Sequence, residues 1–224
     1  MGEIIFNLHG LGDPPTTPSA GELKYWLNEA AFDQLLDEVC LARDMDDMCI
    51  SITFDDGNMS DALIALPALV SRGLTAHFFL CAARVGKPHY LDGVAIRELL
   101  AAGMTIGSHG MNHIDWRRTS DSELDEEISG ARRKLEDVCS QQILEVAIPF
   151  GSYDRRSISR LRKENLNAVF TSDGGVVRSG SWQKARNSLD RTRQHKGIIG
   201  EIRLRDNLVR RARRNLLTLY KSLR

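Results

Sequence analysis

The chain lacks the features that mark secreted, fibrous and membrane-spanning proteins. Its four cysteines are widely spaced and include no CxxC pair, so we expect buried thiols rather than a dense disulfide framework. Only 6 prolines and 18 glycines occur among 224 residues, of which 42% are hydrophobic and 27% charged. This composition excludes a collagen-like, fibrous or disordered chain. No run of about 18 apolar residues is present, which excludes a spanning helix.

The sequence also has no excess of either charge. Its 30 Lys and Arg residues balance its 30 Asp and Glu residues, so the net charge gives no reason to expect a nucleic-acid partner. The N-terminal segment lacks the basic region, apolar region and small-residue cleavage site of a signal peptide. We therefore expect a cytoplasmic protein that binds no nucleic acid. The sequence does not predict its oligomeric state.

Short β-rich runs alternate with amphipathic helical patterns, which is typical of parallel strands joined by crossover helices. One helical pattern is capped by Asn28, and a second begins with a capping box formed by Ser120 and Glu123. The sequence therefore predicts an α/β fold. The six predicted strands are residues 4–8, 49–54, 75–80, 104–108, 144–148 and 168–171.

Two carboxylates stand at the end of the second predicted strand. Asp55 and Asp56 follow the run 49–54 and precede Gly57, which permits a sharp turn. In parallel α/β folds, the loops that follow the strands form the active site. Neighbouring residues at a strand end point in different directions, so the two carboxylates can have different roles. The structural alternative for Asp56 is a turn or a helix cap.

Two histidines follow the fourth predicted strand in the same way. His109 and His113 are four residues apart, so a helical turn would place both imidazoles on one side. Two histidines and one carboxylate can hold a metal ion and leave coordination positions open. With Asp56 they form a candidate metal site, although an HxxxH spacing alone is equally consistent with two polar loop residues.

The other strand ends carry one histidine and one turn. His9 follows the first predicted strand, and the turn from Pro149 to Tyr153 follows the fifth. We expect these segments to converge on one rim with the aspartates and the histidine pair. His77 lies inside an apolar strand and His89 in a loop, so both are expected to be structural.

Three motifs, in this order, resemble the polysaccharide deacetylase family, also called the NodB-homology domain or carbohydrate esterase family 4. They are SITFDDG at 51–57, LLAAGMTIGSHGMNH at 99–113 and IPFGSYD at 148–154. The resemblance runs from about residue 4 to residue 186. It implies a distorted (β/α)7-type barrel of mostly parallel strands, with its active site at the C-terminal rim. It also implies metal-dependent removal of N- or O-acetyl groups from sugars.

The resemblance implies a role for each residue that matches a motif. Asp55 matches the general base, while Asp56, His109 and His113 match the metal ligands. The backbone N–H of Phe150 matches the donor to the oxyanion. Zn²⁺ is the expected metal, although this ligand set also accepts Co²⁺, Ni²⁺ or Mn²⁺.

Two residues expected from the family are missing at their usual places. The arginine that often precedes the motif proline is replaced by apolar residues at 146–148. The role of that arginine is to orient Asp55. We assign this role to Arg186, which resembles an arginine that some subfamilies supply after the last strands. The late Leu-x-His motif, which furnishes a general acid, is also absent, since Arg193 stands two residues before His195. We assign the general acid to His9, with His195 as the alternative.

The last 24 residues carry a net charge of +6 and are predicted to form a basic amphipathic helix. We expect residues 1–200 to form the barrel and residues 201–224 to form this helix, in the same domain or as an appendage. Its apolar face can pack on the barrel, which we favour, or contact an anionic membrane surface. The apolar positions are Leu204, Leu208, Ala212, Leu216, Leu219 and Leu223.

These features predict a metal-dependent hydrolase that removes an N-acetyl or O-acetyl group from a sugar or glycan precursor. Two other functions stay open. One is a deformylase or another amide hydrolase that acts on a lipid- or nucleotide-linked sugar. The other is a non-catalytic barrel that binds carbohydrate, although the presence of both aspartates and both motif histidines argues against it.

Overall fold

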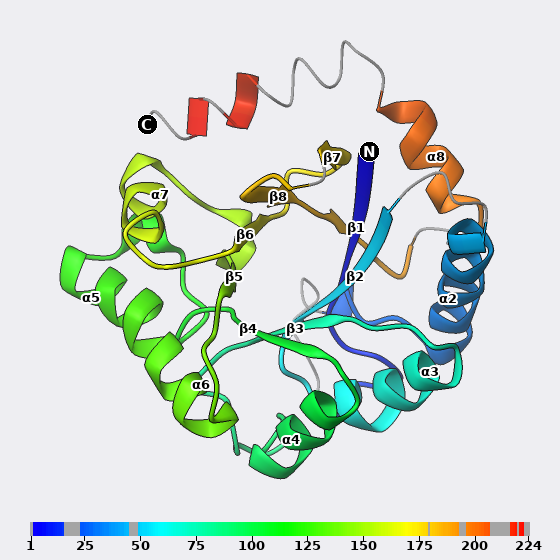
Figure 1. The fold of residues 1–224 in the computed structure, drawn as a ribbon, viewed down its shortest axis with the longest axis horizontal. Coiled ribbons are helices and arrows are strands. Elements are labelled where there is room, and N and C mark those ends of the chain that lie inside the picture. Colours follow the sequence, from blue (N-terminus) through cyan, green and yellow to red (C-terminus); the bar gives the residue numbers. More distant parts are fainter. Residues whose placement is uncertain are drawn as a thin grey trace.

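The computed structural model describes residues 2–15, 23–44, 49–178, 180–192, 196–206, 216–218 and 220–221. Its centre is a sheet of mostly parallel strands that curves into a nearly closed barrel surrounded by helices (Figure 1). The predicted α/β barrel is therefore confirmed. The strands are β1 (Gly2–Leu8), β2 (Cys49–Asp56), β3 (His77–Leu80), β4 (Thr105–Ser108), β5 (Glu145–Ala147), β6 (Ala168–Thr171), β7 (Val176–Arg178), β8 (Gln183–Ala185) and β9 (Asn187–Ser188).

Helices follow most of the parallel strands and cover the outside of the barrel (Figure 1). Two of the helical stretches contain a π-helical turn, η1 (Asp61–Ala65) before α3 and η3 (Glu126–Gly130) between α5 and α6. Short 3₁₀ turns, η2 (Trp116–Arg118) and η4 (Pro149–Gly151), lie in the rim loops. The α-helices are α2 (Glu29–Asp44), α3 (Leu66–Ser71), α4 (Gly93–Ala101), α5 (Asp121–Asp125), α6 (Ala131–Cys139), α7 (Arg155–Leu161) and α8 (Ile198–Arg205).

The barrel closes through the short stretch formed by β8 and β9. The strand order is β7-β1-β2-β3-β4-β5-β6-β8, and all pairs in it are parallel except β1 with β7. β8 pairs with β6, whereas β9 pairs with β1 on the opposite side of the opening. Arg186 is the single residue between these two strands. Closure of the barrel therefore fixes the position of Arg186.

Strand alternation divides the side chains between the barrel interior and the helices. On β1, Ile4, Phe6 and Leu8 join the large core under the helices, whereas Ile5 points into the barrel. Inside the barrel, Ile5 packs in an apolar cluster that also contains Phe79 and other side chains from β3, β5 and β6. Because successive strand residues face opposite sides, the polar residues Asn7, Thr53 and Asp55 continue the inward series above this cluster.

The six predicted strands are all present, within a few residues at each end. Sequence reasoning missed β7, β8 and β9, which lie beyond the last predicted strand. These strands have two or three residues each, too few for an alternating pattern to be recognised. They form because the edges of β1 and β6 offer unpaired backbone groups to the returning chain.

The predicted caps begin the helices where expected. Asn28 Oδ1 accepts a hydrogen bond from the Ala31 N–H at 2.8 Å. Ser120 and Glu123 form a reciprocal capping box at the start of α5. The cysteine prediction is correct only in part, since Cys81 and Cys139 are buried but Cys49 is exposed.

The C-terminal part differs from the single helix predicted over 201–224. Helix α8 begins at Ile198, so it crosses the predicted boundary at 200, and it ends at Arg205 with Asp206 as its C-cap. Ile198, Ile199 and Ile202 pack into the main core. Of the predicted apolar positions, Leu204 is 83% and Leu216 is 67% exposed; these two do not pack on the barrel. Positions 208, 212, 219 and 223 lie outside the described residues.

Among the helices in the described ranges, none is long and apolar enough to cross a membrane.

Candidate active site

Asp55 and Asp56 leave the end of β2 in different directions. Asp55 continues the inward series of the strand and is 2% exposed. Asp56 has a positive φ of 78°, as does the Gly57 that follows it, with φ 74°. This backbone conformation is uncommon for an aspartate and turns Asp56 away from Asp55. The two carboxylates therefore face different neighbours, as the sequence predicted.

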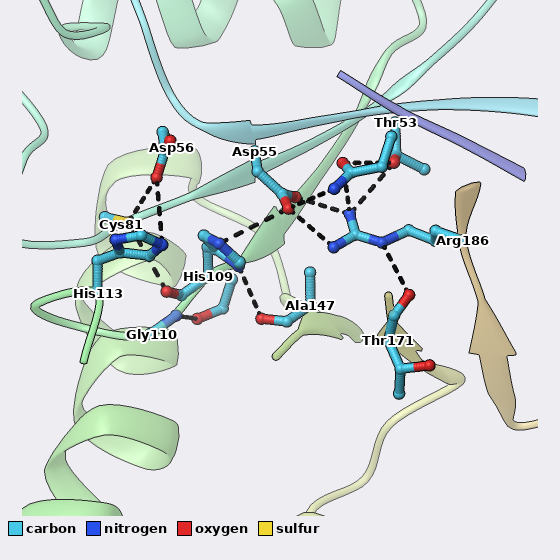
Figure 2. Close-up of polar contacts among 12 residues, drawn as sticks. Thr53, Asp55, Asp56, Cys81, His109, Gly110, His113, Ala147, Thr171 and Arg186 are labelled. Carbon is cyan, nitrogen blue, oxygen red and sulfur yellow. Dashed lines mark hydrogen bonds and ion pairs between the residues drawn. The ribbon is translucent and has the colours of Figure 1, made fainter. Parts of the chain in front are cut away.

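A buried arginine holds Asp55 at both oxygens. Arg186 Nη1 lies 2.7 Å from Asp55 Oδ1, and Arg186 Nη2 lies 2.8 Å from Oδ2 (Figure 2). Asn7 Nδ2 donates a further bond to Oδ2 at 3.0 Å. Burial alone would raise the pKa of Asp55, but the charges of Arg186 and His109 outweigh it and hold the pKa well below its ordinary value. Asp55 is thus a fixed, ionised carboxylate.

The side chains of Asp56, His109 and His113 converge beside Asp55. Each offers one ligand atom, and these three atoms lie within 4.8 Å of one another. His113 has a positive φ of 57°, and its Nε2 lies 3.6 Å from Asp56 Oδ1. His109 Nε2 lies 3.6 Å from Asp55 Oδ2. Figure 2 shows Asp55 between His109 on one side and Arg186 on the other.

The surroundings of the two histidines are compatible with metal binding. His109 Nδ1 is 2.9 Å from the carbonyl oxygen of Ala147, so Nδ1 must donate a proton and Nε2 is the nitrogen that faces the site and can bind a metal. Burial lowers the pKa of His113 to about 4, although Asp56 opposes the shift. Neutral imidazoles and an ionised carboxylate are the forms that ligate Zn²⁺. The residues present therefore fit a divalent metal.

Glu127 supports the loop that carries the two histidines. It is 1% exposed and lies in the π-helical turn η3. Its carboxylate accepts hydrogen bonds from the backbone N–H groups of Met111 and Asn112 at 3.1 and 2.9 Å, and from Trp116 Nε1 at 3.2 Å. Sequence reasoning missed this role. The available signal was a charged residue on the apolar face of the helical pattern that contains Leu124.

Phe150 lies on the solvent side of the same site. It has a positive φ of 58° inside η4 and is 61% exposed. The centroid of its ring is 4.3 Å from that of His113. Gly151 continues the turn at φ 60°, where a Cβ would lie 2.9 Å from the Ser172 backbone nitrogen. The turn therefore needs glycine at 151, and it places Phe150 against the ligand cluster.

His9 also reaches the site, from the end of β1. Its ring stacks on Tyr25 with centroids 4.9 Å apart, and its Nδ1 is buried without a hydrogen-bond partner in the described chain. Burial lowers the pKa of His9, although the charges of Asp56 and Asp55 oppose the shift. The imidazole is therefore mostly neutral near pH 7. The alternative candidate, His195, lies outside the described residues.

Two further histidines take no part in this cluster. His77 pairs with Glu145 at the beginning of β3 and β5, with 2.6 Å between Nδ1 and Oε2. It therefore lies at the opposite end of the barrel from the strand-end cluster. His89 lies in the loop that follows β3. Both placements agree with the structural roles expected for them.

Comparison with known proteins identifies the same family as the motifs. The family model for polysaccharide deacetylase matches residues 42–169. The Bacillus subtilis protein YxkH, a polysaccharide deacetylase by name, is 23% identical over 78% of this chain and 63% of its own length. The peptidoglycan-N-acetylglucosamine deacetylase of Bacillus cereus is 30% identical over 51% of this chain and 52% of its own length. The chain thus spans about half to three fifths of these relatives.

Solved structures show the same fold. BC0361, a polysaccharide deacetylase from Bacillus cereus, is 18% identical, has a TM-score of 0.76, and is matched over 90% of this chain and 69% of its own. The Streptococcus pyogenes deacetylase PplD, solved with acetate, is 18% identical with a TM-score of 0.72, over 89% of this chain and 97% of its own. With the family model matching more than half of the sequence, the chain belongs to the polysaccharide deacetylase family.

Proposed function

We propose that this protein is a metal-dependent hydrolase that removes an acetyl group from an amino sugar in a glycan or glycan precursor. The observation that carries the proposal is a buried, ionised Asp55, held by Arg186, beside the cluster of Asp56, His109 and His113. Family membership supports deacetylation. The name of the Bacillus cereus relative supports an N-acetyl group as the target.

Asp56, His109 and His113 would hold the metal, with Zn²⁺ first and Co²⁺, Ni²⁺ or Mn²⁺ as alternatives. When bound, a divalent metal supplies Lewis acidity to the acyl carbonyl and acidifies water. The chain contributes the two imidazoles and the carboxylate described above. The Ala147 carbonyl keeps His109 in the tautomer this requires.

Asp55 is the proposed general base. Arg186 fixes both of its oxygens, so Asp55 can take a proton from water without first reorienting. The same ion pair stabilises the ionised carboxylate and thus keeps it available as a base across neutral pH. Arg186 acts as a positioning residue here, because it touches Asp55 and not the reacting atoms.

His9 and Phe150 complete the proposed machinery. His9 would donate a proton to the leaving amine. Its Nδ1 is buried and has no hydrogen-bond partner in the described chain, which is consistent with a partner supplied by a bound substrate. Because its pKa is lowered, His9 would not carry this proton beforehand; the proton that Asp55 takes from water would have to pass to His9 before it reaches the leaving amine. The Phe150 N–H would donate to the oxyanion, a contribution of about 3–4 kcal/mol to the barrier by comparison with other oxyanion holes.

Product analysis tests the proposal. Purified protein loaded with Zn²⁺ should release acetate from N-acetylated glucosamine oligomers, and addition of a chelator should abolish the release. His9→Ala should lower kcat about 100- to 10,000-fold while the metal content stays unchanged. Release of formate from formylated sugars, without release of acetate, would favour the deformylase instead. Release of O-linked acetate alone would contradict the N-acetyl group as the target. Binding of glycan without any turnover in the metal-loaded protein would favour a non-catalytic barrel and contradict the proposal.

A further inference from the structure

Arg84 contacts a proposed metal ligand from a loop outside the three motifs. Its Nη1 lies 2.8 Å from Asp56 Oδ1, and both side chains are largely shielded from solvent, at 23% and 16% exposed. His113 Nε2 approaches the same oxygen at 3.6 Å. The guanidinium therefore already occupies the Asp56 oxygen that faces the other ligands.

The loop holds Arg84 in this position. The Arg84 N–H donates to the Cys81 carbonyl at 2.9 Å, and the neighbouring Ala83 N–H donates to the Met111 carbonyl at 3.0 Å. The second bond ties this loop to the one that carries the two histidines. The guanidinium also lies over the ring of Tyr90, 5.0 Å from its centroid. Its approach to Asp56 is thus set by the fold and is not a chance orientation of a surface side chain.

The charges of this arrangement disfavour simultaneous contact of Asp56 Oδ1 with Arg84 and with a metal ion. A shielded carboxylate needs a counter-ion, and Arg84 supplies one at hydrogen-bond distance. A divalent cation bound by the same oxygen would lie close to the guanidinium, where like charges repel strongly because little solvent screens them. Cys81, whose Sγ is 3.8 Å from Asp56 Oδ1, adds only a weak neutral donor.

We propose that Arg84 and the metal ion are alternative counter-ions of Asp56. Arg84 then stabilises the metal-free protein and lowers the affinity of the site for metal, so that the metal can exchange. The inference rests on the proposed metal-dependent function. It differs from a simple positioning role, because loss of a residue that only orients Asp56 would weaken both the metal-free fold and metal binding.

Arg84→Gln, measured against wild type and a matched control, tests the proposal. Arg97→Gln is the control, because Arg97 is an exposed arginine on α4 outside the site. Zn²⁺ affinity is measured by competition with a chromophoric chelator, and thermal unfolding is measured with excess chelator. We expect Arg84→Gln to bind Zn²⁺ at least about tenfold more tightly, yet to unfold at a lower temperature when metal-free. Arg97→Gln should match wild type in both measurements.

An equal or weaker Zn²⁺ affinity in Arg84→Gln would overturn the inference, as would an unchanged unfolding temperature of the metal-free protein. If Arg84→Gln does not fold, Arg84→Met carries the same expectations, since it keeps an unbranched side chain against Tyr90. If wild type binds Zn²⁺ and releases acetate, and Arg84→Gln behaves identically, this inference fails and the proposed function stands. Absence of Zn²⁺ binding in both wild type and Arg84→Gln defeats both this inference and the proposed function.

Discussion

At the scale of single residues, two adjacent carboxylates have different neighbours. Asp55 faces inward, and Arg186 balances its negative charge, whereas Asp56 turns toward the histidines. The left-handed backbone of Asp56 makes this separation possible, since a regular strand would only alternate the two between the faces of the sheet.

We therefore expect Asp55→Asn and Asp56→Asn to have different effects. Asp55→Asn should keep a full equivalent of metal and lose kcat by about 100- to 10,000-fold. It should also lose about 3–5 kcal/mol of stability, because the buried Arg186 loses its charged partner. Asp56→Asn should lose the metal. Metal analysis, steady-state kinetics and denaturant unfolding check these results. If Asp55→Asn loses metal while Asp56→Asn keeps it, the two roles must be exchanged.

Asp61 gives a second prediction at this scale. It is fully buried, and neither carboxylate oxygen has a hydrogen-bond partner in the described chain. Burial, reinforced by the charges of Asp56 and Asp55, raises the pKa of Asp61 well above its ordinary value. The unfolded chain ionises this group near pH 3.8 while the folded chain keeps it protonated, so its contribution to stability falls as pH rises above that value.

Asp61→Asn should therefore stabilise the metal-free protein at pH 7 and have little effect near pH 4. Urea unfolding of both proteins at the two pH values measures the difference. A gain that is equal at both values, or a loss at pH 7, would show that ionisation of Asp61 does not oppose folding.

At the scale of elements, the π-helical turn η3 links a surface helix to the site. The extra residue of this turn accompanies an inward carboxylate, Glu127, on a face that is otherwise apolar. Its hydrogen bonds hold the backbone of the loop that carries His109 and His113. Such turns often occur at functional sites.

Glu127→Gln should weaken Zn²⁺ binding by about 10- to 100-fold, because partners beyond the metal ligands orient them. An amide retains one acceptor oxygen but turns an NH₂ group toward N–H donors, so the loop loses part of its support. Glu126→Gln, on the same turn, serves as the control and should bind metal like wild type. Isothermal titration calorimetry measures the Zn²⁺ affinity of both variants. Equal Zn²⁺ affinities of Glu127→Gln and Glu126→Gln would mean that the loop holds its shape without Glu127.

The C-terminal segment is the second element with a testable property. Leu204, Leu216 and Leu217 are exposed, and residues 201–224 carry a net charge of +6. We expect the full chain to sediment with anionic vesicles at low salt, since each basic residue near an anionic leaflet contributes roughly 1 kcal/mol. A chain that ends at Asp206 keeps all of α8 and should not sediment. The absence of binding by folded full-length protein would remove the predicted membrane contact.

At the scale of the whole molecule, the proposed metal site joins two segments that follow different strands of the barrel. Asp56 comes from the end of β2, and the two histidines come from the segment after β4. A metal bound by all three would connect segments that are far apart in the sequence. It would bind the folded state only, because the unfolded chain does not hold these side chains together.

Metal removal should therefore lower Tm. At a free Zn²⁺ concentration of 100 times Kd, binding stabilises the folded protein by about 2.7 kcal/mol, or about 5–10 °C for a domain of this size. Calorimetry with and without chelator measures the shift. His113→Ala should show no shift on addition of Zn²⁺, because the site loses a ligand. A full shift in that variant would exclude His113 from the site.

Much of the fold could be predicted from local patterns. The six parallel strands are runs of apolar and β-branched residues, and the caps at Asn28 and Ser120 depend on residues within four positions of one another. The motif residues Asp55, Asp56 and His109 were recognised because each stands at the end of a predicted strand, and His113 because it lies four residues after His109. Parallel strands end at one rim, so their convergence required no knowledge of distant contacts.

The sequence by itself therefore determined the barrel, its rim and the residues that follow each strand, because strands, caps and strand ends depend on near neighbours. The resemblance pointed to Arg186, but only the tertiary structure decided how it and the other supporting side chains reach the site. Arg186 meets Asp55 across 131 positions because β8 and β9 close the barrel. Arg84 and Glu127 reach the site through a loop and a helical turn whose side-chain directions no local pattern specifies. Closure and packing bring these charges together, since a buried charge is stable only beside a partner that the fold supplies.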